Sequence, residues 1–274
     1  MMGNLSLYFL LLVTSTQQVA PHDNLNATLW MSHAAEYRMI VLEIYAAAQR
    51  SLDAALADPT WHAALEQGED STALPPAIIV DIDETVLDNT PYQARLVREN
   101  ATYSSASWHQ WVMQARARAL PGAKAFLQYA AGRGVRVFYI TNRNAQDEEA
   151  TRRNLVSEGL PLVEEEDTVL TRHEREEWGS DKASRRAYVA QRYRILLLLG
   201  DDLNDFVSGA RSGSPADRLS LARRHEDAWG SKWFLFPNPT YGSWEGALYD
   251  FEYQRPTWEK RIEKRRYLDR LPPE

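Results

Sequence analysis

The stretch of residues 77–89, which reads AIIVDIDETVLDN, constrains the fold more than any other part of this sequence. Its apolar run, Ile78 to Val80, has the composition of a buried β-strand and ends at two acids, Asp81 and Asp83. If the strand continues, both acids point the same way because side chains alternate along a strand. Acids at the carboxyl end of a strand in an open α/β sheet can act as nucleophile, proton donor or metal ligand. The structural alternative is a strand that runs into an acidic loop or helix start.

Strand-like and helix-like segments alternate along most of the chain. Apolar runs predict strands at residues 78–80, 135–140, 168–170, 195–199 and 233–236. The segments around them predict helices at residues 30–56, 123–131, 144–157 and 181–193, the first of which is long and amphipathic. This alternation is typical of an α/β fold in which helices flank both faces of a parallel sheet.

Residues 90–120 interrupt this alternation. They contain no strand-like run and are rich in helix formers and aromatic residues, which predicts a helical cap over a pocket. No linker or internal repeat divides the chain, so we expect residues 21–274 to form one domain with a C-terminal helical extension. Residues 1–20 contain a short apolar stretch without the positive flank of an export signal. We interpret them as an incomplete signal peptide or as a disordered or packed N-terminus.

Polar residues follow three of the predicted strands. They are Asp81 and Asp83 after Val80, Thr141 to Arg143 after Ile140, and Asp201, Asp202 and Asp205 after Leu199. Because parallel strands present their carboxyl ends at one edge of the sheet, these residues are expected to meet. Carboxylates about 4 Å apart repel by roughly 4 kcal/mol at an effective dielectric near 20, so such a cluster takes up protons or binds a cation. All-oxygen ligation without histidine or cysteine favours Mg²⁺.

Charge and cysteine content exclude several classes of function. The net charge of -7 argues against binding to a nucleic-acid polymer, which usually requires a basic surface. The chain as written has no cysteine, which excludes disulfides, thiolate catalysis and cysteine-ligated zinc. Because the net charge is negative, an anionic substrate would need a local positive group. Lys182, at the start of a predicted helix, can supply one, although a lone lysine at a helix start is usually only solvated.

Taken together, the motifs resemble those of the haloacid dehalogenase-like (HAD) phosphohydrolases. In chain order they are Asp81-Ile-Asp-Glu-Thr-Val, Thr141-Asn-Arg, Lys182 and Gly200-Asp-Asp-Leu-Asn-Asp205. The sequence is most similar to the class C acid phosphatases of the lipoprotein e family, whose two long signatures look like residues 79–89, with Tyr92 following, and residues 199–206. The resemblance implies a Rossmann-like HAD fold with a helical cap.

The resemblance also implies a role for each motif residue. Asp81 would be the nucleophile that takes the phosphoryl group. Asp83 would protonate the leaving alcohol and later activate water. Thr141 and Asn142 would hold the phosphoryl oxygens, and Lys182 would neutralise their charge. The implied Mg²⁺ ligands are Asp81, the main-chain carbonyl of Asp83, and Asp201, with Asp205 completing the acidic shell.

The implied activity is that of a magnesium-dependent acid phosphatase that acts on small phosphomonoesters, with nucleoside 5′-monophosphates as candidate substrates. Aromatic residues in the segments expected to cover the pocket offer faces on which a base can stack, or they pack within the cap. They are Trp108, Trp111, Tyr241 and Trp244. The alternatives are a non-catalytic storage or binding relative, against which the presence of Asp81 and Asp83 argues, and a phosphotransferase on the same scaffold.

The resemblance further implies export, to the periplasm or the outer membrane. The anchored member of the family carries a lipidated N-terminal cysteine, and this chain has no cysteine, so that anchor is in doubt. The second signature often has asparagine where this chain has Asp202. The extra carboxylate could strengthen metal binding, but we expect a surface position for it. The sequence leaves open whether an exported form associates with a membrane and whether it forms a homodimer.

Overall fold

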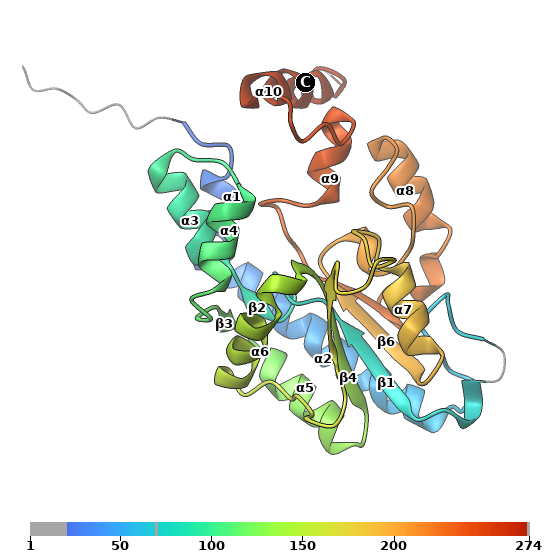
Figure 1. Ribbon diagram of the computed structural model, residues 1–274. Helices are drawn as coiled ribbons and strands as arrows, with labels where there is room; N and C mark the ends of the chain where they lie inside the picture. Colours follow the sequence, from blue (N-terminus) through green and yellow to red (C-terminus); the bar gives the residue numbers. More distant parts are fainter. Residues whose placement is uncertain (1–20, 69–70, 273–274) are drawn as a thin grey trace, which may run out of the picture.

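The computed structural model of the protein describes residues 21–68 and 71–272. At its centre lies a parallel five-stranded sheet in the order β5-β4-β1-β6-β7, which confirms the predicted fold class. Its strands are β1 (Pro76–Val80), β4 (Arg136–Asn144), β5 (Val169–Arg172), β6 (Arg194–Gly200) and β7 (Trp233–Leu235). Figure 1 shows helices on both sides of this sheet and a helical layer beyond one of its edges.

The helices follow the predicted order, with shifted ends. The α-helices are α1 (Leu25–His33), α2 (Ala35–Ala57), α3 (Thr90–Glu99), α4 (Ser105–Val112), α5 (Ala123–Gly132), α6 (Glu148–Ser157), α7 (Ala183–Ala190), α8 (Pro215–Arg223), α9 (Ser243–Gly246) and α10 (Thr257–Leu268). Short 3₁₀ helices are η1 (Ser71–Ala73), η2 (Ala145–Asp147), η3 (Leu203–Asp205), η4 (Glu226–Ala228) and η5 (Ala247–Tyr249).

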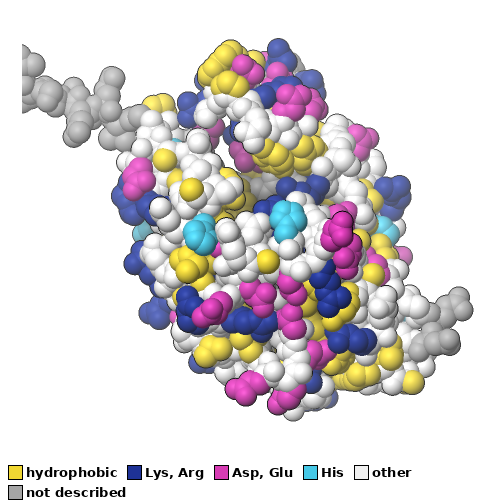
Figure 2. Space-filling view, viewed as in Figure 1, with side chains coloured by type: hydrophobic (Ala, Val, Ile, Leu, Met, Phe, Trp, Pro, Cys, Tyr) yellow, Lys and Arg dark blue, Asp and Glu magenta, His cyan; other side chains and the backbone are white. Residues whose placement is uncertain are grey.

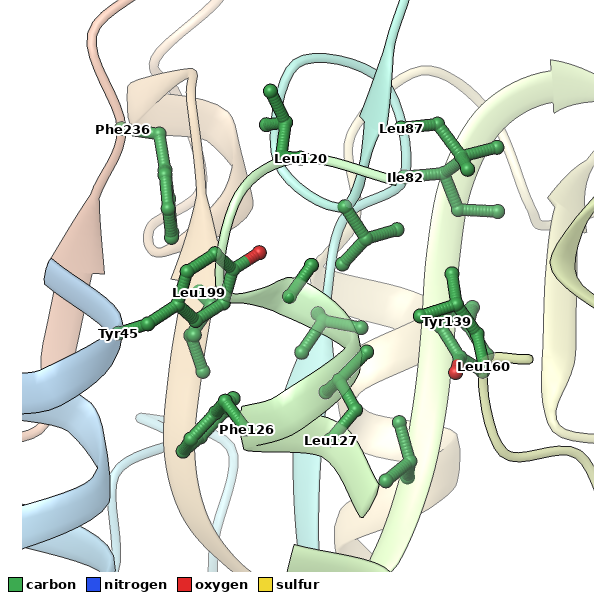
Figure 3. Packing of buried hydrophobic residues seen from close by; sticks show 14 of the residues in the cluster. Tyr45, Ile82, Leu87, Leu120, Phe126, Leu127, Tyr139, Leu160, Leu199 and Phe236 are labelled. Atoms are coloured by element: carbon green, nitrogen blue, oxygen red, sulfur yellow. The ribbon is translucent and has the colours of Figure 1, made fainter. Parts of the chain in front are cut away.

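Both faces of the central strand β1 are buried. Ile78 and Val80 belong to a hydrophobic cluster with residues of α2 and α5, whereas Ala77 and Ile79 belong to a second cluster with residues of α7. Figure 3 shows part of the first cluster, in which α5 lies against the sheet beside the aromatic ring of Tyr45. A strand buried on both faces reads as a continuous apolar run, which is why this one was recognisable. The two clusters fix the carboxyl end of β1 on a rigid base.

The long helix predicted over residues 30–56 is interrupted at Ala34, so the single-helix prediction is wrong. Ala34 is extended, with φ -74° and ψ 131°, and its amide donates to the carbonyl of Trp30 at 3.0 Å to close α1. The break lets α1 pack on the cap helix α3 while α2 packs along α5. Tertiary packing thus overrides a continuous helical pattern.

Two other elements differ from the prediction. β4 continues past Ile140 to Asn144, because Asn144 pairs with Arg172 of β5. The cap contains the predicted helices, α3 and α4, but it is closed at its base by an antiparallel pair, β2 (Leu87–Asp88) and β3 (Arg118–Ala119). The prediction that residues 90–120 contain no strand is therefore wrong at its end. A two-residue strand is too short to produce an alternating pattern.

The C-terminal extension, α9 and α10, lies on the side toward which the carboxyl ends of the strands point (Figure 1). Figure 2 shows a hollowed surface beneath α10, with acidic and basic side chains interspersed over this face. None of the helices in the described part of the chain has the length and apolar character needed to cross a membrane. The interpretation of residues 1–20 lies outside the described residues.

Candidate active site at the carboxyl edge of the sheet

The adjacent strands β4, β1 and β6 bring the predicted motifs together. Because β1 lies between the other two, Thr141, Asp81 and Asp201 come from neighbouring strands at one edge of the sheet. The amide of Asp81 donates to the carbonyl of Leu199 at 2.9 Å, which continues the strand pairing by one residue. This bond fixes the backbone of Asp81 beside the end of β6.

Three of the predicted acids form one cluster. Carboxylate oxygens of Asp81, Asp201 and Asp205 all lie within 4.8 Å of one another. The approach of Asp205 depends on Gly200, where an added Cβ would overlap its carboxylate. The donors are all carboxylate oxygens, the type that Mg²⁺ prefers, and the distances suit ligation of a single cation. The cluster therefore fits the metal site that the sequence predicted.

Lys182 lies inside this cluster and is only 3% exposed. It is the residue that precedes α7, and its Nζ donates to Asp81 and, at 2.5 Å, to Oδ1 of Asp205. Burial alone would lower the pKa of Lys182, but the two carboxylates raise the pKa on balance, so the ammonium stays charged. Lys182 is therefore buried and paired, unlike most lysines at the start of a helix, which are solvated.

The cluster carries more negative charge than Lys182 neutralises. Burial raises the pKa of Asp81 to about 7, an effect that Lys182 opposes and that Asp205 and Asp83 reinforce. Burial also raises the pKa of Asp201 well above its ordinary range, with Asp81 and Asp205 adding to the shift. A buried carboxylate whose pKa is raised by its neighbours is stabilised by a proton or by a bound cation. Perturbed carboxyls at a strand edge are a mark of functional sites.

Asp83 does not join the cluster with its side chain. Its carboxylate is held by Arg143, with Nη2 at 2.7 Å from Oδ1 and Nε at 3.2 Å from both oxygens. Asn89 donates a further hydrogen bond from Nδ2 to Oδ1 at 2.9 Å. The strand ends at Val80 rather than continuing, so the strict alternation that would align Asp81 with Asp83 does not apply. Only the main chain of Asp83 remains as the metal ligand that the resemblance implied.

Thr141 and Asn142 are held in place by an arginine that the sequence analysis missed. The Arg185 side chain, fully buried, donates to the carbonyl of Thr141 and, at 2.7 Å, to Oδ1 of Asn142. Asn142 in turn donates to the carbonyl of Ser180 at 3.1 Å. The hydroxyl oxygen of Thr141 accepts from the amide of Arg143 at 3.1 Å. Arg185 follows the motif lysine by three positions, but an arginine on a helix gives no sequence signal of burial.

The aromatic residues separate into two groups. Trp111 is only 4% exposed, so its ring faces are not offered to a ligand, and Trp108 is partly buried beside Tyr92. Tyr241 donates its hydroxyl proton to Glu84, and Trp244 is 42% exposed. Tyr241 precedes α9 and Trp244 lies on it, and both contact Asn238: the amide of Tyr241 donates to its Oδ1 at 3.4 Å, and Nε1 of Trp244 donates to its carbonyl at 3.1 Å. Because Nδ2 of Asn238 donates to Asp201 at 2.7 Å, these two aromatic residues lie near the acidic cluster.

Asp202, for which we expected a surface position, and Glu84 make contacts near the site that the sequence did not reveal. Asp202, partly exposed, accepts from the amide and the hydroxyl of Ser243, both at 2.6 Å, and so ties the C-terminal extension to the motif loop. Glu84 is fully buried in a left-handed conformation with φ 58° and accepts from the amide of Asn89 at 2.8 Å. Both lie within recognised motifs, yet their partners are distant in sequence.

A parallel α/β sheet that carries an acidic cluster, a buried lysine and a cap at its carboxyl edge defines a phosphohydrolase of the haloacid dehalogenase type. The chain belongs, more narrowly, to the HAD superfamily, subfamily IIIB (acid phosphatase), whose family model matches residues 12–244. The resemblance read from the motifs is thereby confirmed, and the protein is an acid phosphatase of this subfamily.

Solved structures agree with this assignment. The class C acid phosphatase from Bacillus anthracis is 36% identical, with a TM-score of 0.79 over 92% of this chain and 97% of that one. The same enzyme with tungstate bound gives 35% identity and a TM-score of 0.78 over the same shares, 92% and 97%.

Two curated soybean (Glycine max) proteins are more distant. The stem 28 kDa and stem 31 kDa glycoproteins are each 24% identical over 147 residues, which is 52% of this chain. The chain spans only about half the length of these curated relatives, 56% and 49% respectively.

Proposed function

We propose that this acid phosphatase hydrolyses phosphomonoesters through a phosphoaspartyl intermediate on Asp81. The observation that carries the proposal is the buried contact of Asp81 with Lys182 inside the acidic cluster, while Asp83 is held apart by Arg143. A carboxylate beside a fixed ammonium is oriented for attack, and a second carboxyl that is held outside the cluster is placed to act as general acid and base.

The proposed reaction has two steps, in which Asp81 carries the phosphoryl group and Asp83 transfers the protons. In the first, an oxygen of Asp81 forms a bond to phosphorus, the ester oxygen leaves, and Asp83 gives that oxygen a proton. In the second, water attacks phosphorus, Asp83 takes back a proton, and Asp81 and inorganic phosphate are released. Lys182, with Thr141 and Asn142, would stabilise the charge on the phosphoryl oxygens.

The acidic cluster is proposed as a Mg²⁺ site. Asp81, Asp201 and the main-chain carbonyl of Asp83 would hold the ion, with Asp205 beside them. When bound, Mg²⁺ supplies positive charge that offsets the carboxylates and stabilises the transferring phosphoryl group. The Bacillus anthracis relative with tungstate bound supports the binding of an oxyanion by an enzyme of this fold.

Nucleoside 5′-monophosphates are the proposed substrate class. The support comes from Tyr241 and the exposed Trp244, which both contact Asn238, a hydrogen-bond donor to Asp201. An aromatic face there can stack on a base whose phosphate reaches the cluster. The net charge of -7 and the mixed surface in Figure 2 favour a small-molecule phosphomonoester over a nucleic-acid polymer.

Export and oligomeric state remain proposals that cell and solution experiments test. The apolar stretch of residues 5–13 supports export to the periplasm or outer membrane. Cell fractionation of the full chain would establish its location, including association with a membrane. Light scattering would distinguish a monomer from a homodimer.

The proposed function is tested with a panel of 4-nitrophenyl phosphate, nucleoside monophosphates and ribose 5-phosphate, each measured with EDTA and with Mg²⁺. We expect turnover with Mg²⁺, loss with EDTA, and no turnover by Asp81→Asn. The control is Asp227→Asn, the same substitution at an exposed position on η4. Protein-bound phosphate that hydroxylamine releases would identify the acyl phosphate. A folded, metal-binding parent that turns over nothing on the panel would instead favour the non-catalytic alternative, and transfer to added alcohols would favour a phosphotransferase.

A further inference from the structure

The cap helix α4 touches both groups that hold the carboxylate of Asp83. We propose that Trp111, acting through Asn89, and Trp108, acting through Arg143, are positioning residues for the proton donor, not a platform for substrate. The inference deepens the proposed function, and it rests on the role of Asp83 assigned there. It implies that the cap sets the efficiency of proton donation to the leaving group.

The first arm runs from Trp111 to Asp83 through a buried amide. The indole Nε1 of Trp111 donates to Oδ1 of Asn89 at 2.8 Å, and Nδ2 of Asn89 donates to Oδ1 of Asp83 at 2.9 Å. Trp111 is 4% exposed and Asn89 is 0% exposed. An indole nitrogen can only donate, so it fixes the carbonyl end of the amide toward itself and the NH₂ end toward Asp83. Without the indole, only the carboxylates of Asp83 and Glu84, which accept from Nδ2, still oppose the opposite orientation of the amide, so the side chain is held less firmly.

The main chain of Asn89 is held independently of its side chain. The main-chain amide of Asn89 donates to Oε1 of Glu84 at 2.8 Å, which holds the backbone of Asn89 over the β1 turn. Glu84 also accepts from the hydroxyl of Tyr241. The backbone position of Asn89 therefore does not depend on Trp111, and the indole contributes specifically to the orientation of the side chain.

The second arm runs through Arg143, whose guanidinium is engaged on every side. Two of its nitrogens bind Asp83, while Nη1 donates to Oγ1 of Thr151 at 3.1 Å. The guanidinium carbon lies over the ring of Trp108, 5.8 Å from the ring centroid. An arginine that binds a carboxylate through two nitrogens and contacts an aromatic ring keeps one orientation, and a lysine cannot make the same set of contacts.

The same helix is anchored to the body of the enzyme near this arginine. His109, next to Trp108 on α4, contacts the buried carboxylate of Asp147 at the end of η2. The carbonyl of Asp147 accepts from the hydroxyl of Thr151 at 2.8 Å, and Thr151 is the residue that receives Arg143. Docking of α4 and placement of the guanidinium thus share one anchor. A shift of α4 would therefore weaken the support of both side chains that hold Asp83.

The consequence falls on one step of the reaction. A carboxyl that is misplaced by about 1 Å can cost on the order of 100-fold in the step that uses it. An alkyl leaving group needs the proton of Asp83, whereas 4-nitrophenolate leaves readily without it. The ratio of kcat/KM for glycerol 3-phosphate to kcat/KM for 4-nitrophenyl phosphate therefore reports the placement of Asp83, because kcat/KM covers the reaction up to departure of the leaving group.

The experiment measures this ratio in Trp111→Phe, Trp108→Leu and Arg143→Lys, with Asp83→Asn as the reference for a missing proton donor. Trp233→Phe is the matched control, because Trp233 is 1% exposed and its Nε1 donates at 2.8 Å to the carbonyl of Ala63, away from the site. Thermal unfolding confirms that each variant folds. We expect the ratio to fall by about tenfold in each of the three variants, while Trp233→Phe keeps the parent ratio. Trp111→Phe added to Asp83→Asn should lower the ratio no further.

Three results would overturn the inference. An equal loss on both substrates in the folded Trp111→Phe and Arg143→Lys variants would show that these residues only stabilise the fold. A further fall of the ratio in the double variant would show that Trp111 acts elsewhere. An unchanged ratio in Asp83→Asn would refute the proton-donor role itself and thereby remove both the proposed mechanism and this inference. The single Asp83→Asn measurement separates this last failure from the first two.

Discussion

The Nζ of Lys182 lies 2.5 Å from Oδ1 of Asp205, and the same ammonium donates to Asp81. One buried cation is therefore shared between the proposed nucleophile, which follows β1, and an acid on η3, which follows β6. Asp201, the third carboxylate of the cluster, accepts a hydrogen bond from Asn238. The stability of the site without metal thus depends on Lys182 more than on any single carboxylate.

Lys182→Met should abolish turnover and destabilise the metal-free protein. Removing one partner of a buried ion pair costs about 3 to 5 kcal/mol, because the carboxylates left behind are not compensated. Urea unfolding in EDTA measures the loss, and Lys124→Met, at an exposed position on α5, is the control. An unchanged unfolding midpoint for Lys182→Met would mean that the cluster takes up protons instead of relying on the ammonium.

Asp201→Asn should stabilise the metal-free protein while removing its response to Mg²⁺. Burial and two neighbouring acids raise the pKa of Asp201, so its ionisation costs stability, and the cost grows as pH rises from about 4 through the raised pKa. Asparagine carries no charge and can still accept from Asn238. We expect the melting temperature in EDTA to exceed that of the parent at pH 8 and the gap to narrow at pH 5.

When Mg²⁺ is added, the parent should have the higher melting temperature, because only the parent retains the full set of proposed metal ligands. Asp167→Asn, on the surface near β5, is expected to show neither effect and serves as the control. A parent that is more stable than Asp201→Asn at pH 8 in EDTA would contradict the view that the acids repel one another in the absence of metal.

The edge of the sheet could be predicted because each of its parts has a local signal. The run Ile78 to Val80 is apolar enough to identify a buried strand, and the acids that follow it and Leu199 are adjacent to their strands in sequence. Parallel topology then requires these ends to meet. Lys182 needed the complete set of motifs, since a lysine at a helix start has no signal of its own.

The direction in which the Asp83 side chain points could not be predicted, because it depends on the turn after β1 and on hydrogen bonds from Asn89 and Arg143. The chain leaves the strand at Val80 and turns at Glu84, where φ is 58°, so the period-two rule fails within three residues of the nucleophile. The burial of Trp111 was equally hidden. Spacing of three residues places Trp108 and Trp111 on one face of a helix, but sequence does not say whether that face meets a ligand or Asn89.

Asp202→Ala should loosen the C-terminal extension without unfolding the core. Asp202 accepts from the amide of Ser243 and from its hydroxyl, each at 2.6 Å, and also caps η3. Losing hydrogen bonds to a charged group costs about 1.5 to 3 kcal/mol each in a protected setting, and we expect a smaller local cost at this partly exposed position. Hydrogen exchange of residues 240–246 should accelerate several-fold.

Asp217→Ala is the matched control for this prediction. Asp217 also belongs to a capping box, as the third residue of α8 with Ser214 as the N-cap, and its side chain accepts from the amide and hydroxyl of Ser214. Asp217→Ala should accelerate hydrogen exchange in α8 and leave residues 240–246 unchanged. Equal protection of residues 240–246 in Asp202→Ala and the parent would show that the extension is held by α10 and its ion pairs rather than by the motif loop.

The final prediction concerns the exposed ring of Trp244. If this ring stacks on the base of a nucleotide, Trp244→Leu should lower kcat/KM for nucleoside monophosphates and leave that for ribose 5-phosphate unchanged. Stacking is worth roughly 1 to 3 kcal/mol per base, or about five- to 150-fold, and purines and pyrimidines should differ by less because every base has a π-face. Trp258→Leu is the control, because Trp258 is 62% exposed but lies on α10. If both substrates slow alike in Trp244→Leu, or if the parent enzyme does not favour nucleotides over ribose 5-phosphate, the ring contributes only to packing against Asn238 and the nucleotide proposal fails.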